Sequence, residues 1–292
     1  MRRFVVFTCA IAGIVAVGLL LPHSHFSHRA FAAAQPQPNW STGTCAENNS
    51  GGWGHWGEVH VCEIRGATLP SGYLNLRTTN GTIDVTGEDR SDVAVEASVN
   101  VWASSESAAN DLLKQIVIVT TDGNIHDRGP NISFFTPGGY AVSYRLRAPS
   151  KMDADFHTVN GGIHLSHLDG ALRFGTVNGG VTLDRLNGDV QGQTVNGAIK
   201  IALAGDRWEG AGLSAGTTNG GIGVSLPDNY SAHLEAATVN GGISVDFPVT
   251  VQGKIKHHLN ATVGSGGPTI HTRTVNGGIT IKHGGLNWGS GD

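Results

Sequence analysis

The chain has 292 residues, of which 43 are glycine and only 14% are charged, and its formal net charge is −4. This length allows one large domain or two small ones. The weakly acidic balance argues against nucleic acid or anionic lipid as partners. Many glycines without a collagen period, set among Thr, Val and Ile, are typical of short strands and tight turns.

Residues 1–34 have the pattern of a signal peptide. Arg2 and Arg3 are followed by an apolar run from Phe4 to Leu21 and by small residues that end at Ala34. An uncleaved N-terminal anchor is the alternative, because such a run can nearly span a bilayer. Cleavage would remove three of the 19 basic residues and no acidic residue. The mature chain would then have 16 basic and 23 acidic residues and a net charge of −7. We therefore expect an exported protein, in the periplasm, at the cell surface or outside the cell.

Residues 35–57 read as a flexible arm rich in Pro, Gly and Trp. In an exported chain, the two cysteines that remain after cleavage, Cys45 and Cys62, are expected to form a disulfide. The arm also carries aromatic and imidazole side chains, which could bind sugar or could cover the first open edge of the sheets; we favour the second. These residues are Trp40, Trp53, His55 and Trp56.

Residues 58–150 predict an irregular β portion with one helix. Apolar alternation predicts strands over residues 74–78, 83–85, 92–102, 116–121 and 140–147. Ser104 or Ser105 can cap a helix that runs to Ile116, with Glu106 in its first turn. This portion has no fixed period, and we treat it as part of the same fold or as a cap on it.

Residues 151–283 are organised around a repeat of the form Thr-Val-Asn-Gly-Gly-Ile. The Asn of each copy falls at positions 160, 178, 196, 219, 240 and 276, so that the steps are 18, 18, 23, 21 and 36 residues. Within the longest step, Thr262 to Gly267 resembles a decayed copy with an insertion. An earlier relative, Thr78 to Ile83, stands apart from the array. Residues 284–292 are expected to be a disordered tail.

The Asn-Gly pairs are predicted to be structural turns, because both residues tolerate the positive φ of a tight corner. Stacked Asn side chains could also bond to one another along the array. The predicted turn residues are Asn80, Gly81, Asn160, Gly161, Asn178, Gly179, Asn196, Gly197, Asn219, Gly220, Asn240, Gly241, Asn276 and Gly277.

Strand alternation predicts which side of the unit each motif residue faces. The Thr lies on the apolar face and should point inward, where its hydroxyl needs a partner from a neighbouring copy. The Val beside the turn should point outward or into the corner, and the Ile after the turn inward. If the outward valines align, they form an apolar stripe suited to partner contact. They are Val159, Val177, Val195, Val239 and Val275.

The near-constant step predicts an all-β fold, a β-solenoid in the form of a single-stacked β-helix. Its coils would have about 18–21 residues, with one short helix inserted in the N-terminal part. The alternative is a β-sandwich of hairpins, because Asn-Gly is the strongest short hairpin signal.

The order of these features resembles the bacterial putative-adhesin family, long filed as a domain of unknown function. The resemblance rests on Leu74 to Val85, the helical insert, Arg147-Ala148-Pro149 and the copies from Thr158 to Ile281, and it covers about residues 70 to 283. It implies an exported or cell-envelope β-solenoid with no established catalytic residues.

The residues themselves indicate no enzyme, cofactor or metal site. The outward acids Asp155, Asp184, Glu235 and Asp246 fall at different positions of the unit, so that no carboxylate pair for polysaccharide cleavage is specified. Two groups of histidines, 157, 164 and 167 and then 257, 258, 271 and 283, are read as exposed polar side chains. We expect a non-enzymatic adhesin or envelope interaction module, with an unknown surface protein or glycan as its partner. A carbohydrate-binding or carbohydrate-cleaving β-helix is the alternative.

Overall fold

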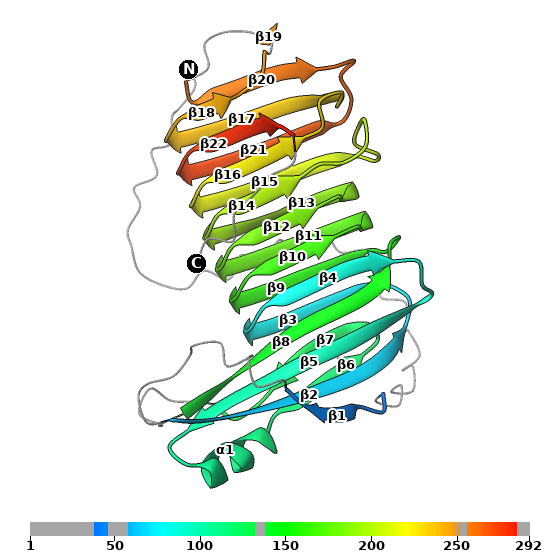
Figure 1. Cartoon of the computed structure of the whole chain (residues 1–292), viewed down its shortest axis with the longest axis vertical. Helices are drawn as coiled ribbons and strands as arrows, with labels where there is room; N and C mark the ends of the chain where they lie inside the picture. Colours follow the sequence, from blue (N-terminus) through cyan, green and yellow to red (C-terminus); the bar gives the residue numbers. More distant parts are fainter. Residues whose placement is uncertain (1–37, 46–57, 132–137, 249, 252–255, 285–292) are drawn as a thin grey trace, which may run out of the picture. The chain divides into compact units, whose positions relative to one another are not determined.

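The computed structural model in Figure 1 describes residues 38–45, 58–131, 138–248, 250–251 and 256–284. The predicted signal peptide, Trp53, His55, Trp56 and residues 285–292 of the predicted tail lie outside this described part. The described chain is built almost entirely of strands and includes one helix, as expected of an all-β fold. That helix is too short to cross a membrane.

Two eleven-stranded sheets, which we call sheet A and sheet B, contain all the strands of the described residues. In spatial order, sheet A consists of β1 (Ser41–Thr44), β2 (Val59–Pro70), β5 (Asp92–Ala103), β8 (Gly138–Pro149), β4 (Ile83–Glu88), β10 (Ile163–Ser166), β12 (Val181–Asp184), β14 (Ile199–Ala202), β16 (Ile222–Leu226), β22 (Ile279–His283) and β18 (Ile243–Val245). Sheet B consists of β19 (Thr250–Val251), β20 (His258–Val263), β17 (Ala232–Asn240), β21 (Thr269–Asn276), β15 (Gly212–Asn219), β13 (Asn187–Asn196), β11 (Asp169–Asn178), β9 (Ala154–Asn160), β3 (Leu74–Asn80), β7 (Asn124–Arg128) and β6 (Val117–Thr121).

Each motif copy forms the corner of a coil that passes from sheet B to sheet A. At the first copy, β9 ends at Asn160 in sheet B and β10 begins at Ile163 in sheet A. Each strand then pairs in parallel with the same residues of the neighbouring copy, as Thr176 does with Thr194. The alternative of Asn-Gly hairpins is therefore wrong, because the strands on either side of each turn lie in different sheets. The repeat is β-solenoid-like.

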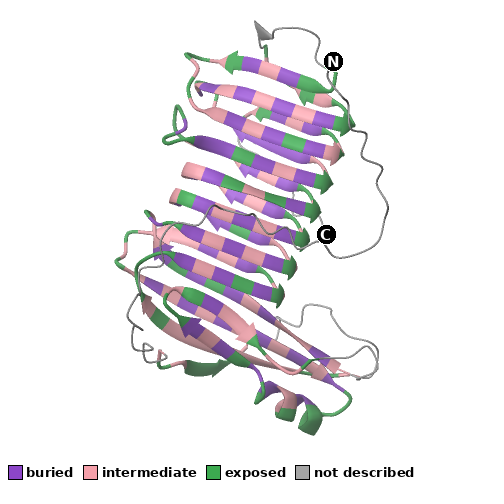
Figure 2. Ribbon diagram, turned by 180° about the vertical axis from the view of Figure 1, so that it is seen from behind, coloured by how far each residue is buried: buried purple, intermediate pink, exposed green. Residues whose placement is uncertain are grey.

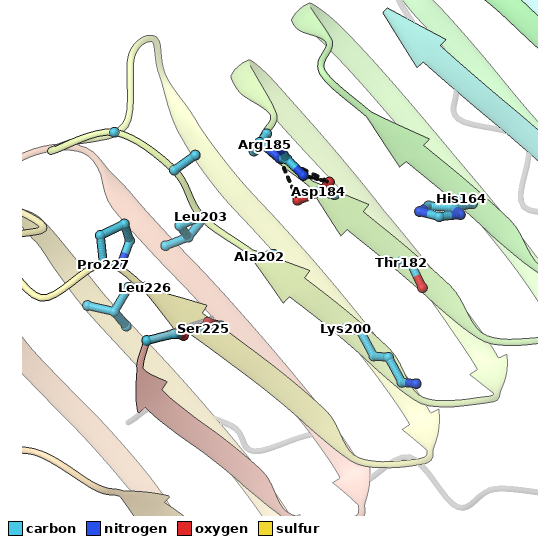
Figure 3. Close-up of a pocket in the computed structure, with 13 residues that line it drawn as sticks. His164, Thr182, Asp184, Arg185, Lys200, Ala202, Leu203, Ser225, Leu226 and Pro227 are labelled. Atoms are coloured by element: carbon cyan, nitrogen blue, oxygen red, sulfur yellow. Dashed lines mark hydrogen bonds and ion pairs between the residues drawn. The ribbon is translucent and has the colours of Figure 1, made fainter. Parts of the chain in front are cut away.

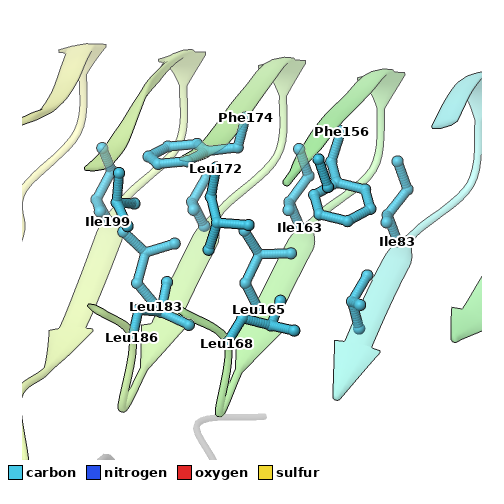
Figure 4. Close-up of a cluster of buried hydrophobic side chains, with 14 of the residues drawn as sticks. Ile83, Phe156, Ile163, Leu165, Leu168, Leu172, Phe174, Leu183, Leu186 and Ile199 are labelled. Carbon is cyan, nitrogen blue, oxygen red and sulfur yellow. The ribbon is translucent and has the colours of Figure 1, made fainter. Parts of the chain in front are cut away.

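The core lies between the two sheets, and burial alternates along most of the strands (Figure 2). Figure 4 shows Phe156, Leu172 and Phe174 of sheet B packed against Ile163 and the other apolar side chains of sheet A. The motif Thr residues are buried with them, at 0–7% exposure, so that the predicted inward direction of the Thr is confirmed. Packing between coils is complementary as well: Gly192 leaves room for the ring of Phe174, which would lie 2.5 Å from a Cβ at that position.

The motif copies stack in sequence order from the N-terminal end, but the order changes at the C-terminal end. The early copy at Asn80 stacks directly on the copy at Asn160, because β3 pairs with β9 and β4 with β10. At the other end, β21 and β22, which carry the last copy, lie between the copies at Asn219 and Asn240. The interpretation of Thr262 to Gly267 as a decayed motif copy is wrong. Thr262 and Val263 belong to β20, which runs antiparallel to β17, and a turn follows them.

The N-terminal portion extends both sheets and carries the helix. Strands β2, β5 and β8 are long and antiparallel, and β8 joins this group to the coils by pairing in parallel with β4. Helix α1 (Glu106–Leu113) begins after Ser105, whose hydroxyl accepts a bond from the Ala108 N–H, as the capping signal predicted. Cys45 and Cys62 are joined in a disulfide, and Trp40 packs against the edge of the core.

Candidate interaction surface

The Asn-Gly corner is tight because neighbouring coils approach each other closely at the first glycine. A Cβ on Gly179 would lie 1.9 Å from the carbonyl oxygen of Gly161, and a Cβ on Gly197 would lie 2.0 Å from that of Gly179. The expected reason for the glycine was positive φ, and this is wrong for the copies from Gly161 onward; only the early Gly81 has a positive φ, of 146°. The motif therefore needs glycine because a neighbouring backbone occupies the place of a side chain.

The inward Thr hydroxyl finds its partner at the same glycine. Thr176 Oγ1 donates to the Gly161 oxygen at 2.9 Å, and Thr194 Oγ1 donates to the Gly179 oxygen at 2.8 Å. Equivalent bonds of 2.8–2.9 Å occur at every other copy from Thr158 onward. Because each hydroxyl is satisfied by the neighbouring coil, the cost of burying it is avoided only when the coils are stacked.

The motif Asn side chains form a continuous ladder along the corner. Each amide nitrogen donates to the amide oxygen of the adjacent Asn at 2.8–2.9 Å. In spatial order the ladder contains Asn80, Asn160, Asn178, Asn196, Asn219, Asn276 and Asn240. It holds every copy in the same register, including the two that are out of sequence order.

The opposite corner is the one that uses positive φ. His167 and Arg185, which follow β10 and β12, have φ of 57° and 52°. Their N–H groups donate to Asp184 and Ala202 of the next coils at 3.0 and 2.9 Å. Sequence reasoning missed this corner: Arg185 is not among the residue types that favour the left-handed region, although His167 is one of them.

The motif valines form an exposed line beside the Asn ladder. Val159, Val177, Val195 and Val239 are 40%, 40%, 37% and 54% exposed, which confirms their predicted outward direction, while Val275 is half-buried. We call the line the valine ridge; in spatial order it consists of Val159, Val177, Val195, Thr218, Val275 and Val239. Six neighbouring strands at about 4.8 Å spacing give it a length of about 24 Å.

A groove of about 600 Å³ lies on the outer face of sheet A. Figure 3 shows His164, Thr182 and Lys200 pointing outward from three consecutive coils on one side of it. The Arg185 guanidinium lies 3.0 Å from the Asp184 carboxylate, so that these two charges balance each other. Asp184 is the only acid among the lining residues, whereas glycosidic cleavage uses a pair of carboxyl groups.

The four acids singled out in the sequence do not come together. Asp155 and Glu235 are both on sheet B, but five strand spacings, or about 24 Å, separate them. Asp184 is on sheet A, and Asp246 follows β18, four strand spacings or about 19 Å away. Each has its own polar contact: Asp155 with His157 at 2.6 Å, Asp184 with Arg185, Glu235 with His271 at 3.2 Å, and Asp246 with the His283 N–H at 3.0 Å.

The histidines are distributed in the same way. His157 is on the outer face of sheet B, His164 is on that of sheet A, and His167 is at the far corner. Among the residues that the structure describes, no group of three His, Cys, Asp or Glu side chains could hold a metal ion.

Two buried polar groups that the sequence did not reveal lie in the N-terminal portion. Asp127 Oδ1 and the Tyr144 hydroxyl are both buried, and neither has a hydrogen-bond partner in the described chain. Burial raises the pKa of the Asp127 carboxyl above its ordinary value of 3.8. Burial, and then the nearby Asp127 charge, raise the pKa of Tyr144. The alternating pattern of β7 could not predict this, because it does not show what faces Asp127.

The fold and its surface define a β-solenoid-like repeat protein whose motif residues serve stacking. The family model named Toastrack DUF4097 matches residues 67–282, and the chain therefore belongs to the Toastrack family of domains of unknown function. The resemblance drawn from the Thr-Val-Asn-Gly-Gly-Ile copies is confirmed by this match. No curated protein matches the chain.

Several solved structures are similar to the chain at low identity. A putative cell adhesion protein from Clostridium sporogenes is 14% identical over 85% of this chain and 100% of that one, with a TM-score of 0.35. A putative adhesin from Bacteroides fragilis is 12% identical over 75% and 96%, also with a TM-score of 0.35. A putative lipid binding protein from Parabacteroides distasonis is 10% identical over 77% and 97%, with a TM-score of 0.32.

Proposed function

We propose that the protein is an exported, non-enzymatic interaction module of the cell envelope, with an adhesin-like role. In this proposal a single stack of coils presents the valine ridge to a partner. The ridge carries the proposal, because the exposed Val159, Val177, Val195 and Val239 lie with Thr218 and the half-buried Val275 along one line about 24 Å long beside the Asn ladder. The signal-like residues 1–34 and the Cys45–Cys62 disulfide support export.

A non-enzymatic role is supported by the separation of the acids. Acid–base cleavage of a polysaccharide needs two carboxyl groups within about 10 Å of each other. Asp155, Asp184, Glu235 and Asp246 are distributed over both sheets and over several coils, and the groove on sheet A contains one acid. The carbohydrate-cleaving alternative has no observation in its favour. Carbohydrate binding is an outcome that the experiment below can distinguish.

The experiment compares three added charges on the ridge with three added charges elsewhere. The ridge variant combines Val159→Asp, Val177→Asp and Val195→Asp. The control combines Gln191→Asp, Ser214→Asp and Thr182→Asp. Gln191 and Ser214 are four residues before the ridge position on the outer face of sheet B, and Thr182 is on sheet A. Binding of each purified protein to envelopes of the producing bacterium is measured by sedimentation. Circular dichroism and melting temperature verify that both variants fold.

We expect the ridge variant to bind at least about tenfold more weakly than the wild type. Three valine side chains that the partner would cover are replaced by charges, at a loss of about 1 kcal/mol or more of binding free energy each. The control should bind as the wild type does. Protease treatment of the envelopes identifies a protein partner, and periodate treatment identifies a glycan. Equal binding by the two variants, or no binding by the wild-type protein, would overturn the proposal.

A further inference from the structure

The last coil of the chain occupies a slot between two earlier ones. In sheet B, β21 pairs in parallel with β15 on one side and with β17 on the other. In sheet A, β22 pairs in the same way with β16 and β18. The strands that form the two walls of the slot therefore precede in sequence the coil that fills it.

The coil β21–β22 is held equally by both walls. Thr274 Oγ1 donates to the Gly220 oxygen of one wall at 2.8 Å, and Thr238 Oγ1 of the other wall donates to Gly277 of the coil at 2.8 Å. The amide of Asn276 likewise donates to one neighbouring Asn and accepts from the other. Ile270, Ile279 and Ile281 of the coil are at most 2% exposed. The slot is thus specific for a segment with this motif.

The connection into the coil passes over the strand that forms one wall. Strands β20 and β21 lie on opposite sides of β17, and the short segment Gly264 to Pro268 joins them. Gly264, Gly266 and Gly267 have φ of 57°, 77° and 150°, which suits a sharp crossing. β17 and β18 therefore stand one coil beyond β15 and β16, with the last coil between them.

We propose that coil β21–β22 is exchangeable between two copies of this chain, each of which fills the slot of the other. A second copy carries the same Thr, Asn, Gly and Ile residues in the same register, so that every contact of the slot is remade in the exchanged pair. The only difference between a chain's own coil and its partner's is the effective concentration, which is of the order of 1 mM for a short connection. Exchange thus joins two solenoids through their C-terminal ends.

The test uses variants with one added cysteine each, whose thiols meet across the slot wall. Ser214 of β15 and His271 of β21 are paired residues on the outer face of sheet B. Protein with Ser214→Cys is mixed with protein with His271→Cys, unfolded in denaturant without reductant so that the Cys45–Cys62 disulfide stays closed, and refolded together. A disulfide that links one variant to the other across this pair forms only when the coil of one chain occupies the slot of the other.

A matched control uses a pair of neighbouring strands that follow each other directly in sequence. Arg173 of β11 and Gln191 of β13 are also partners on sheet B, and Arg173→Cys is co-refolded with Gln191→Cys in the same way. Covalent dimer is measured on non-reducing gels after refolding at about 1 µM and at about 200 µM, below the effective concentration of the connected coil.

We expect the dimer fraction of the Ser214/His271 mixture to rise about 100-fold between about 1 µM and about 200 µM. At about 200 µM, the control mixture should give at least tenfold less dimer than the Ser214/His271 mixture. A dimer yield equal to that of the control, or no rise with concentration, would overturn the proposal. The refolded dimer should also elute as a species of twice the monomer mass. The result is independent of whether the valine ridge binds a partner.

Discussion

Replacing Gly179 with Ala should destabilise the protein far more than replacing the adjoining Gly180. An added Cβ at Gly179 would lie 1.9 Å from the carbonyl oxygen of Gly161, whereas one at Gly180 would lie 3.4 Å from that of Ala198. Neither glycine has a positive φ. The two substitutions therefore differ in the space available and not in backbone strain.

The magnitude follows from how far the coils would have to move apart. A normal contact distance of about 3.5 Å requires a displacement of more than about 1 Å. That displacement lengthens the Thr176 bond to Gly161 and the Asn178 bond to Asn160, both now 2.9 Å. Overpacking costs about 1–3 kcal/mol and each lost hydrogen bond costs about 1 kcal/mol, so we expect a loss of about 3–5 kcal/mol. At about 2–4 °C per kcal/mol, Tm should fall by about 10 °C.

Differential scanning calorimetry and urea unfolding of Gly179→Ala, Gly180→Ala and the wild type measure this difference. Gly180→Ala should be neutral or should stabilise by about 0.4–1 kcal/mol, since Ala restricts the unfolded chain. Ala198 already occupies the equivalent position of the next copy. If both substitutions lowered Tm equally, close stacking at the first glycine would not be the reason for the motif.

Three further predictions concern single residues. Burial raises the pKa of the Asp127 carboxyl, so the folded protein binds the carboxyl proton more tightly than the unfolded chain does. The protonated carboxyl therefore contributes stability that is complete below pH 3.8. This contribution is lost as the pH rises through the raised pKa of the folded state. Asp127→Asn should remove this dependence, which is measured by urea unfolding between pH 3 and pH 8. His167→Gly should stabilise by about 1 kcal/mol in thermal unfolding, because the left-handed φ of 57° strains a residue with a side chain; a loss of stability would contradict this reason. Thr176→Val should cost about 1–3 kcal/mol in the same assay, because the carbonyl oxygen of Gly161 loses its donor, and an unchanged Tm would show that this bond contributes little.

The sequence predicted the local structure of the repeat well. Period-two alternation is enough to place Thr158 inside, Val159 outside and Ile163 inside, because a strand that is buried on one face has only two possible assignments. The spacing of 18 residues between copies predicted a solenoid, because a coil of that length can pass through two sheets and return. The helix start at Ser105 was also predictable, since capping depends on the nearest few residues.

The order of the coils was not predictable from the sequence. The step of 36 residues from Asn240 to Asn276 allows the last coil to stack either outside the array or between earlier coils. Every copy presents the same Thr, Asn and Gly to its neighbours, so the motif itself does not specify which copies meet. The antiparallel strand β20 was missed for a related reason, because Thr262 and Val263 match the start of the motif although they pair against β17.

The reason for the glycine was also beyond the sequence. Asn-Gly is associated with positive φ in isolated turns, and only the stacked structure shows that the carbonyl group of Gly161 fills the place where a Cβ of Gly179 would be. The candidate surface was predicted in part: the outward valines, including Val275, followed from alternation. The partial burial of Val275 and its place between Thr218 and Val239 are seen only in the structure.

Disulfide mapping of the last coil in the monomeric protein tests the stacking order most directly. Three double-cysteine variants place thiols at Ser214 and His271, at His271 and Glu235, and at Ser214 and Glu235. The first two pairs are partners on adjacent strands, and the third lies two strand spacings, or about 9.6 Å, apart, which exceeds the reach of a disulfide of about 7 Å. We predict that the first two close within the monomer and that the third stays open. Coils stacked in sequence order would instead close the Ser214–Glu235 pair and leave the Ser214–His271 pair open, whether or not the His271–Glu235 pair closes. That result would contradict the account.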